Sequence, residues 1–109
     1  MSRIHFLKQF AVEDRHYNTK KVLDDMINSD EYNDRFVAAN HPDLSPDQIG
    51  KLSKDPEYVV RISIARRKDV PIRHLYNLHH DEYGSVRTYA QLNPISDTAE
   101  FKKYHPGAT

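Results

Sequence analysis

The sequence predicts an all-α fold of four repeated units, each about 26 residues long and each containing two short helices. Three observations lead to this prediction: positions that recur at one fixed spacing, helix N-cap signals at the same place in the units, and apolar residues spaced for one helix face. The chain has 109 residues, which suits a single domain. We therefore expect one repeat domain over residues 1–109, with units at about 3–28, 29–54, 55–80 and 81–104 and a tail at 105–109.

Positions 26 residues apart hold similar residues along the chain, and no insertion is needed to align them. Three such columns are mainly apolar: Leu23, Ile49, Leu75 and Phe101; Met26, Leu52, Leu78 and Tyr104; and Val12, Ala38, Ile64 and Ala90. A further column contains Arg35, Arg61 and Arg87. This agreement over successive copies indicates one supersecondary unit used repeatedly.

The second half of each unit carries the signals of a short helix. Thr19, Ser45 and Asp97 fall in one column with Pro71, and Thr, Ser and Asp are favoured N-cap residues. Ser45 is followed by Pro46 and by Gln48, which predicts a capping box, and Asp97 with Glu100 repeats that box. The predicted helices are 20–28, 46–54, 71–80 and 98–104.

The first half of each unit is also predicted to be helical. Residues 59–64 do show strand-like alternation. However, small Ala residues at the recurring positions favour a helix, and a strand would have to alternate with a helix in every unit. The predicted helices contain Phe10–Val12, Phe36–Ala38, Ile62–Ile64 and Thr88–Ala90.

Composition excludes several classes of function. The chain has no Cys, which rules out disulfides, thiolate zinc sites, iron–sulfur clusters and Cys nucleophiles. The first 16 residues lack the apolar core of a secretion signal, and no apolar run approaches the roughly 20 residues that span a membrane. We therefore expect a soluble, cytoplasmic protein that binds no membrane and requires no cofactor.

Two successive units match a known repeat pattern. The matching residues are Ala39, Asn40, His41, Pro42, Leu44, Ile49 and Leu52 in one unit, and Asp55, Val60, Arg61, Ile64, Ala65, Val70, Pro71, Leu75 and Leu78 in the next. In this pattern the chain resembles the leucine-rich repeat variant family, which is HEAT-like. The resemblance implies a short right-handed α-solenoid in which α-helices alternate with short or 3₁₀ helices. The chain departs from the pattern at Arg67-Lys68, where the family has Asn-Pro, and it lacks the cysteine cluster of the founding type.

The column of Arg35, Arg61 and Arg87 has two interpretations. It is either a ladder of anion-binding guanidinium groups or a scaffold feature that bonds carbonyls or carboxylates between units. Repetition at the period of the fold favours the scaffold, with Asp55 and Asp81, six residues upstream of an Arg, as partners.

A basic stripe is predicted on the turns between the two helices of each unit. Its candidate binding residues are Arg66, Arg67, Lys68, Arg15, His41 and Arg73. Stacked units place such turns side by side, and a basic stripe can hold phosphates or an acidic protein surface. The alternative interpretation is a turn whose charges are simply solvated.

The uneven charge favours a protein partner over a nucleic acid. Residues 24–57 hold nine acidic and three basic residues, and these acids would repel DNA running along the units. No catalytic motif is present, and His74 and His79 are five residues apart rather than the four that allow chelation on a helix. The sequence thus predicts a non-enzymatic adaptor, inhibitor or modulator, with nucleic-acid binding as the alternative and a homodimer through Tyr89, Phe101 and Tyr104 as a further expectation.

Overall fold

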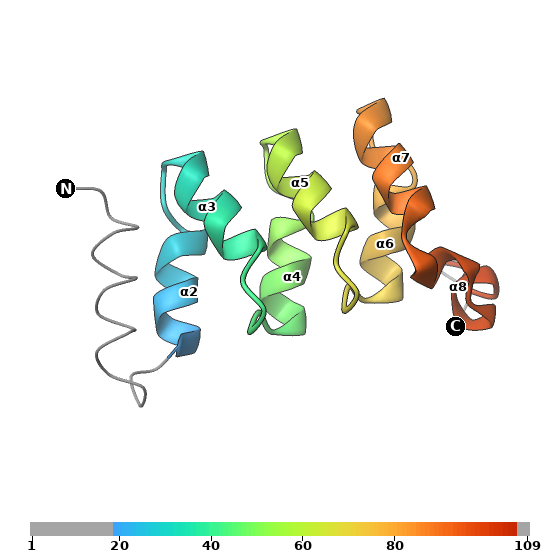
Figure 1. The fold of residues 1–109 in the computed structure, drawn as a ribbon, viewed down its shortest axis with the longest axis horizontal. Coiled ribbons are helices and arrows are strands. Elements are labelled where there is room, and N and C mark those ends of the chain that lie inside the picture. Colours follow the sequence, from blue (N-terminus) through green and yellow to red (C-terminus); the bar gives the residue numbers. More distant parts are fainter. Residues whose placement is uncertain (1–18, 107–109) are drawn as a thin grey trace.

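The computed structural model describes residues 19–106, and every regular element among them is helical (Figure 1). No strand occurs in this range, so the predicted all-α class is confirmed and residues 58–65 are a helix. The predicted helix around Phe10–Val12, and the candidate residue Arg15, lie outside the described residues. The elements are α2 (Thr19–Ile27), α3 (Tyr32–Ala39), α4 (Pro46–Leu52), α5 (Tyr58–Ala65), α6 (Ile72–Leu78), α7 (Gly84–Leu92), η1 (Pro94–Asp97) and α8 (Ala99–Lys102).

The helices from α2 to α7 form two layers. Figure 1 shows α3, α5 and α7 in one row and α2, α4 and α6 in the other, with η1 and α8 at the end. Helix α5 packs against both α3 and α7, and each helix of the second row packs against the next helix along the chain. The described part is elongated, with extents of 44 × 27 × 23 Å.

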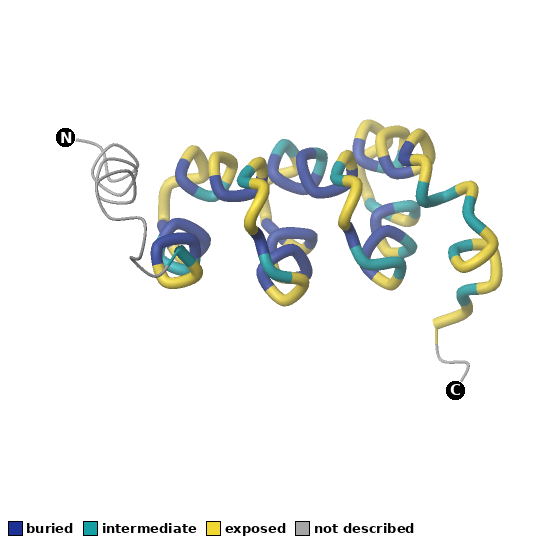
Figure 2. The backbone as a smooth tube through the Cα atoms, turned by 60° about the horizontal axis from the view of Figure 1, so that its bottom comes forward, coloured by how far each residue is buried: buried dark blue, intermediate teal, exposed yellow. Residues whose placement is uncertain are grey.

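The recurring apolar columns form the core between these layers. Leu23, Ile49 and Leu75 are each at most 1% exposed, as the repeat predicts. Their fourth equivalent, Phe101, is only half-buried. Figure 2 shows buried stretches in each helix from α2 to α7, whereas η1 and α8 contain none.

Helix α4 begins as its sequence predicts. Ser45 Oγ accepts a hydrogen bond from Gln48 N at 3.2 Å, and Gln48 Oε1 accepts one from Ser45 N at 2.9 Å. Pro46 occupies the first turn, where its missing N–H costs nothing. Helices α4 and α6 are short α-helices, and the 3₁₀ geometry implied by the resemblance occurs in η1 instead.

The last predicted helix differs from the prediction at its start. Asp97 is not an N-cap but the last residue of η1, which begins at Pro94. Asn93 Oδ1 accepts from Ile95 N at 3.0 Å and so starts this 3₁₀ turn. The cap of α8 is Thr98, whose Oγ1 accepts from Phe101 N at 3.2 Å. The Asn-Pro turn therefore displaces the helix start by one residue from the repeat register.

Candidate functional site

The arginines that recur every 26 residues bond groups in neighbouring helix pairs, and we call the contact between such pairs a seam. Arg61 Nε donates to Asp81 Oδ2 at 2.8 Å, and its Nη2 donates to Asp81 Oδ1 at 3.1 Å. The third nitrogen, Nη1, donates to the backbone carbonyl of Asp55 at 2.6 Å. The scaffold role is therefore correct, but the upstream Asp55 supplies a carbonyl, and the carboxylate comes from 20 residues downstream.

Arg35 repeats this geometry one unit earlier. Its Nε and Nη2 donate to the Asp55 carboxylate at 2.8 and 3.4 Å, and its Nη1 donates to the carbonyl of Ser29 at 2.9 Å. The Arg35 side chain is 13% exposed and that of Asp55 is 4% exposed. Each of these arginines therefore joins the loop before its own helix to the loop before the next helix of the same layer, in an arrangement that we call a rung.

The aspartate of each rung also shapes the start of a helix. Asp55 Oδ1 accepts from Glu57 N at 2.9 Å, and Asp81 Oδ1 accepts from Tyr83 N at 2.9 Å. Burial raises the pKa of Asp81, but the bond from Arg61, the Tyr83 N–H and the charges of Arg61 and Arg87 outweigh burial and lower it. The same pairing raises the pKa of Arg61 above its ordinary value.

Arg67, a predicted binding residue, is used by the scaffold. Its Nη1 donates to the carbonyls of Ala39 at 2.9 Å and His41 at 2.8 Å, and its Nε and Nη2 hold the Asp69 carboxylate at 2.8 and 3.0 Å. This pairing lowers the pKa of Asp69 despite partial burial. The side chain is 10% exposed, so it is not the free cation that the sequence predicts.

Asn93 makes the same pair of backbone contacts 26 residues further along the chain than Arg67 does. Asn93 Nδ2 donates to the carbonyls of Ala65 and Arg67, both at 2.8 Å. These carbonyls precede it by 28 and 26 residues, the same separations that join Arg67 to its own two carbonyls. Arg67 thus does with a guanidinium what the Asn of the repeat pattern does with an amide.

Arg66 and Lys68, on either side of Arg67, are exposed. The guanidinium carbon of Arg66 lies 5.4 Å from the centre of the Tyr89 ring. Both residues line a shallow, open depression of about 570 Å³ between the ends of α3 and α5, together with Asn40 and Ser63. The structure therefore brings two exposed cations, one of them against the Tyr89 ring, and hydrogen-bonding side chains to one open depression.

The other members of the predicted stripe are less favourably placed. His41 Nδ1 accepts from Asp43 N at 3.0 Å, and the imidazole is half-buried. Arg73 is exposed on α6 but does not line the depression. The stripe therefore reduces, within the described part of the chain, to Arg66 and Lys68 with Arg67 supporting them.

The exposed large apolar side chains lie on one layer, a distribution that sequence reasoning missed. Within residues 19–106, all of them lie in α3, α5 or α7 or at the N-cap of α7: Tyr32, Phe36, Val37, Tyr58, Tyr83, Tyr89 and Leu92. Tyr58 and Tyr83 are stacked, with ring centres 4.9 Å apart. From the sequence, Tyr32, Tyr58 and Tyr83 are either interface aromatics or half-buried contacts between units, and the shared column of Tyr32 and Tyr58 favours the second interpretation. All three are exposed.

The aromatic residues predicted to form a homodimer face are engaged within the chain. Phe101 packs on His79, with ring centres 4.8 Å apart, and Tyr104 packs on Tyr76 at 5.3 Å. Tyr89 contacts Arg66 as described above. The dimer stays a prediction, with less free aromatic surface than the sequence suggests.

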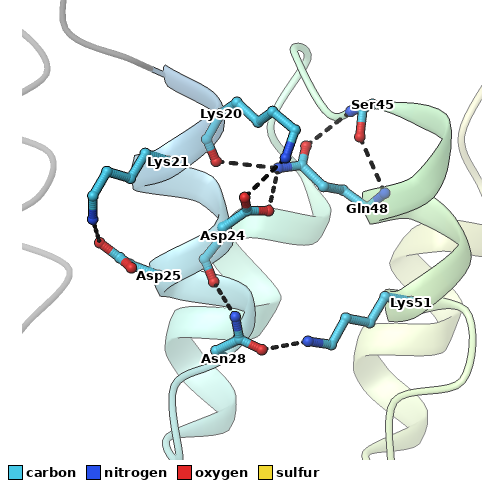
Figure 3. Close-up of polar contacts among 8 residues, drawn as sticks. All are labelled: Lys20, Lys21, Asp24, Asp25, Asn28, Ser45, Gln48 and Lys51. Atoms are coloured by element: carbon cyan, nitrogen blue, oxygen red, sulfur yellow. Dashed lines mark hydrogen bonds and ion pairs between the residues drawn. The ribbon is translucent and has the colours of Figure 1, made fainter.

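The acidic side of the chain, between α2 and α4, is a network of polar contacts (Figure 3). Gln48 Nε2 donates to Asp24 Oδ1 at 2.8 Å and to the carbonyl of Lys20 at 3.3 Å, and Lys51 bonds Asn28. The bonds from Gln48 and Lys20 lower the pKa of Asp24. Asp24, and Asp25 through its ion pair with Lys21, therefore have local partners.

Within residues 19–106, no group of three or more His, Asp or Glu side chains is placed to hold a metal ion. No helix in this range is long and apolar enough to cross a membrane. Comparison with protein-family models, with curated proteins and with solved structures finds no match to the chain.

Proposed function

We propose that the chain is a short right-handed α-solenoid of four 26-residue units, of the leucine-rich repeat variant type. Two contacts that recur at the unit spacing support this proposal: the rungs of Arg35 and Arg61, and the carbonyl bonds of Arg67 and Asn93. Stacked units of this kind bury a continuous core and present a broad, rigid surface, which is commonly used for binding.

We infer that this surface is a non-enzymatic docking site for a protein, in the manner of an adaptor, inhibitor or modulator in the cytoplasm. The observation that supports it best is the gathering of exposed Tyr and Phe side chains on the α3, α5 and α7 layer. Aromatic and Arg side chains supply much of the binding energy at protein interfaces. The depression of Arg66 and Lys68 adjoins Tyr89 of this layer and suits an acidic patch on the partner.

The experiment compares two charge-reversed double variants by affinity purification from the source cells. Arg66→Glu/Lys68→Glu changes the depression, whereas Lys102→Glu/Lys103→Glu changes the net charge equally at exposed positions of the last unit. Arg67 is left intact because its loss would disturb the scaffold. We expect one stoichiometric protein with the wild type and the control variant, and its loss with the first variant.

Two outcomes contradict this proposal. One is a partner that the first variant retains as fully as the control does. The other is binding to nonspecific DNA or RNA at low salt that falls steeply as salt rises, which would favour the nucleic-acid alternative.

A further inference from the structure

Arg87 is the last arginine of its column, and no carboxylate of the described residues is bonded to it. Arg35 and Arg61 each hold an aspartate 20 residues downstream. The residue 20 positions after Arg87 is Gly107, which has no side-chain carboxylate. No carboxylate of residues 19–106 forms an ion pair with Arg87, so within that range its rung has no acid.

The guanidinium of Arg87 is nevertheless anchored like the other two. Its Nη1 donates to the carbonyl of Asp81, six residues upstream, at 2.6 Å. The equivalent bonds of Arg35 and Arg61 are 2.9 and 2.6 Å long. In those two rungs it is the remaining pair, Nε and Nη2, that binds the carboxylate. The same pair of Arg87 is left as a preorganised two-pronged donor.

The residue beside this donor leaves it uncovered. Gly84 occupies the column in which the earlier units have Tyr32 and Tyr58. A Cβ atom at position 84 would lie 3.3 Å from Arg87 Nη2. A Cβ atom there would be in tight contact with the guanidinium, and Gly84 avoids this contact.

We propose that Arg87 binds the carboxylate of an aspartate in a turn of a protein partner. A guanidinium edge matches a planar carboxylate through two parallel N–H···O bonds. The chain itself shows the form of acid that fits: Asp55 and Asp81 each meet an arginine while accepting the N–H two residues further on. Arg87 does not line the depression of Arg66 and Lys68, so this site is independent of the one proposed above.

The test follows the Nε–H resonances of the arginines by NMR. The probe is the blocked tetrapeptide Asp-Pro-Glu-Tyr, the sequence of residues 55–58, and its control is the same peptide with Asn for Asp. We expect the Asp peptide to shift Arg87 Nε–H saturably and to bind at least about tenfold more tightly than the Asn peptide, because charge-assisted bonds are about twice as strong. Exposed Arg73 and paired Arg61 serve as internal comparisons and should not respond at the same concentration.

Arg87→Lys keeps the charge but removes the two-pronged donor. Peptide binding to this variant is followed by the backbone amide shifts around position 87, and it should be abolished while the rest of the amide spectrum stays that of the folded chain. Arg66→Glu/Lys68→Glu should leave peptide binding unchanged, which separates this site from the depression. The proposal is overturned if Arg87 and Arg73 respond alike, if the Asn peptide or acetate binds as tightly as the Asp peptide, or if Arg87→Lys binds normally.

Discussion

The α2–α4 seam and the α4–α6 seam place different chemistry at equivalent positions. In the first, Gln48 reaches back to Asp24. The residues 26 positions after Gln48 and Asp24 are His74 and Gly50. The His74 ring lies against Gly50, as the Gln48 side chain lies against Asp24. A polar pair in one seam is thus replaced by a ring fitted against a glycine in the other.

The two seams also differ in their exposure to water. The Asp24 side chain is 42% exposed, whereas His74 is 8% exposed and its Nδ1 is buried without a hydrogen-bond partner. Burial lowers the pKa of His74, and the charges of Arg73 and Lys54 lower it further. Residues at the same two positions of the 26-residue spacing therefore meet in both seams, through a hydrogen bond in one and through close fit in the other.

Among changes in these two seams, the largest effect on stability is expected from Gly50→Ala. A Cβ atom there would lie 2.5 Å from His74 Nε2, and the buried ring has little room to move. Overpacking of this kind costs about 1–3 kcal/mol, partly offset by the helix preference of Ala over Gly of about 0.5–1 kcal/mol. Urea unfolding should show the loss, and His74→Ala should relieve it in the double variant. Equal losses in the presence and absence of the ring would contradict the close fit.

The next effect is on the dependence of stability on pH. Because the folded pKa of His74 is lowered, the unfolded chain binds the proton more readily, and stability falls as pH drops below the ordinary histidine value of 6.5. His79, shielded by burial and close to His80, acts in the same direction. The slope reaches at most about 1.4 kcal/mol per pH unit for each group.

His74→Gln should reduce this slope, leaving the part due to His79. Paired carboxylates such as Asp24 and Asp69 have lowered pKa values, so their contribution is present above the ordinary Asp value of 3.8 and is lost only as pH falls further. Denaturant melts between pH 5 and pH 7.5 are the measurement. An unchanged slope in His74→Gln would mean that the ring is not shielded in the folded chain.

A smaller effect is expected in the first seam. Gln48→Ala removes the bond to Asp24 and one half of the capping box, and it should cost about 1 kcal/mol, the usual net value for lost hydrogen bonds. Asp24→Asn, at a half-exposed position, should cost less than about 0.5 kcal/mol. Thermal melts of both variants show which one loses more stability. A larger loss for Asp24→Asn would contradict the greater contribution that we assign to Gln48.

The period of 26 residues was sufficient to predict the helices and most of the core. It did not identify the partners in the rungs, because sequence spacing shows that an arginine recurs but not which side of the seam its guanidinium faces. Asp55 lies six residues before Arg61 along the chain, yet its carboxylate bonds Arg35. Helix packing, which brings residues 20 positions apart together, decides this pairing.

The candidate site was predicted less well. Arg67 reads as one of three exposed cations in a turn, and only the three-dimensional contacts show that it replaces the amide of Asn93. The useful signal was the departure from the Asn-Pro pattern at Arg67-Lys68, which marks a position where the scaffold needs a donor. Arg66 and Lys68 carry no such requirement, so their exposure agrees with the prediction.

The most direct test of the repeated seam is a double-mutant cycle on Arg61 and Asp81, measured as unfolding free energy in urea. Their side chains are 8% and 9% exposed, and breaking a buried pair costs about 3–5 kcal/mol. The account predicts that Arg61→Ala and Asp81→Ala are strongly non-additive, with a coupling above about 1.5 kcal/mol, as for other close buried pairs. Additive losses would mean that Arg61 does not meet Asp81 across the seam, and the account of stacked units would be contradicted.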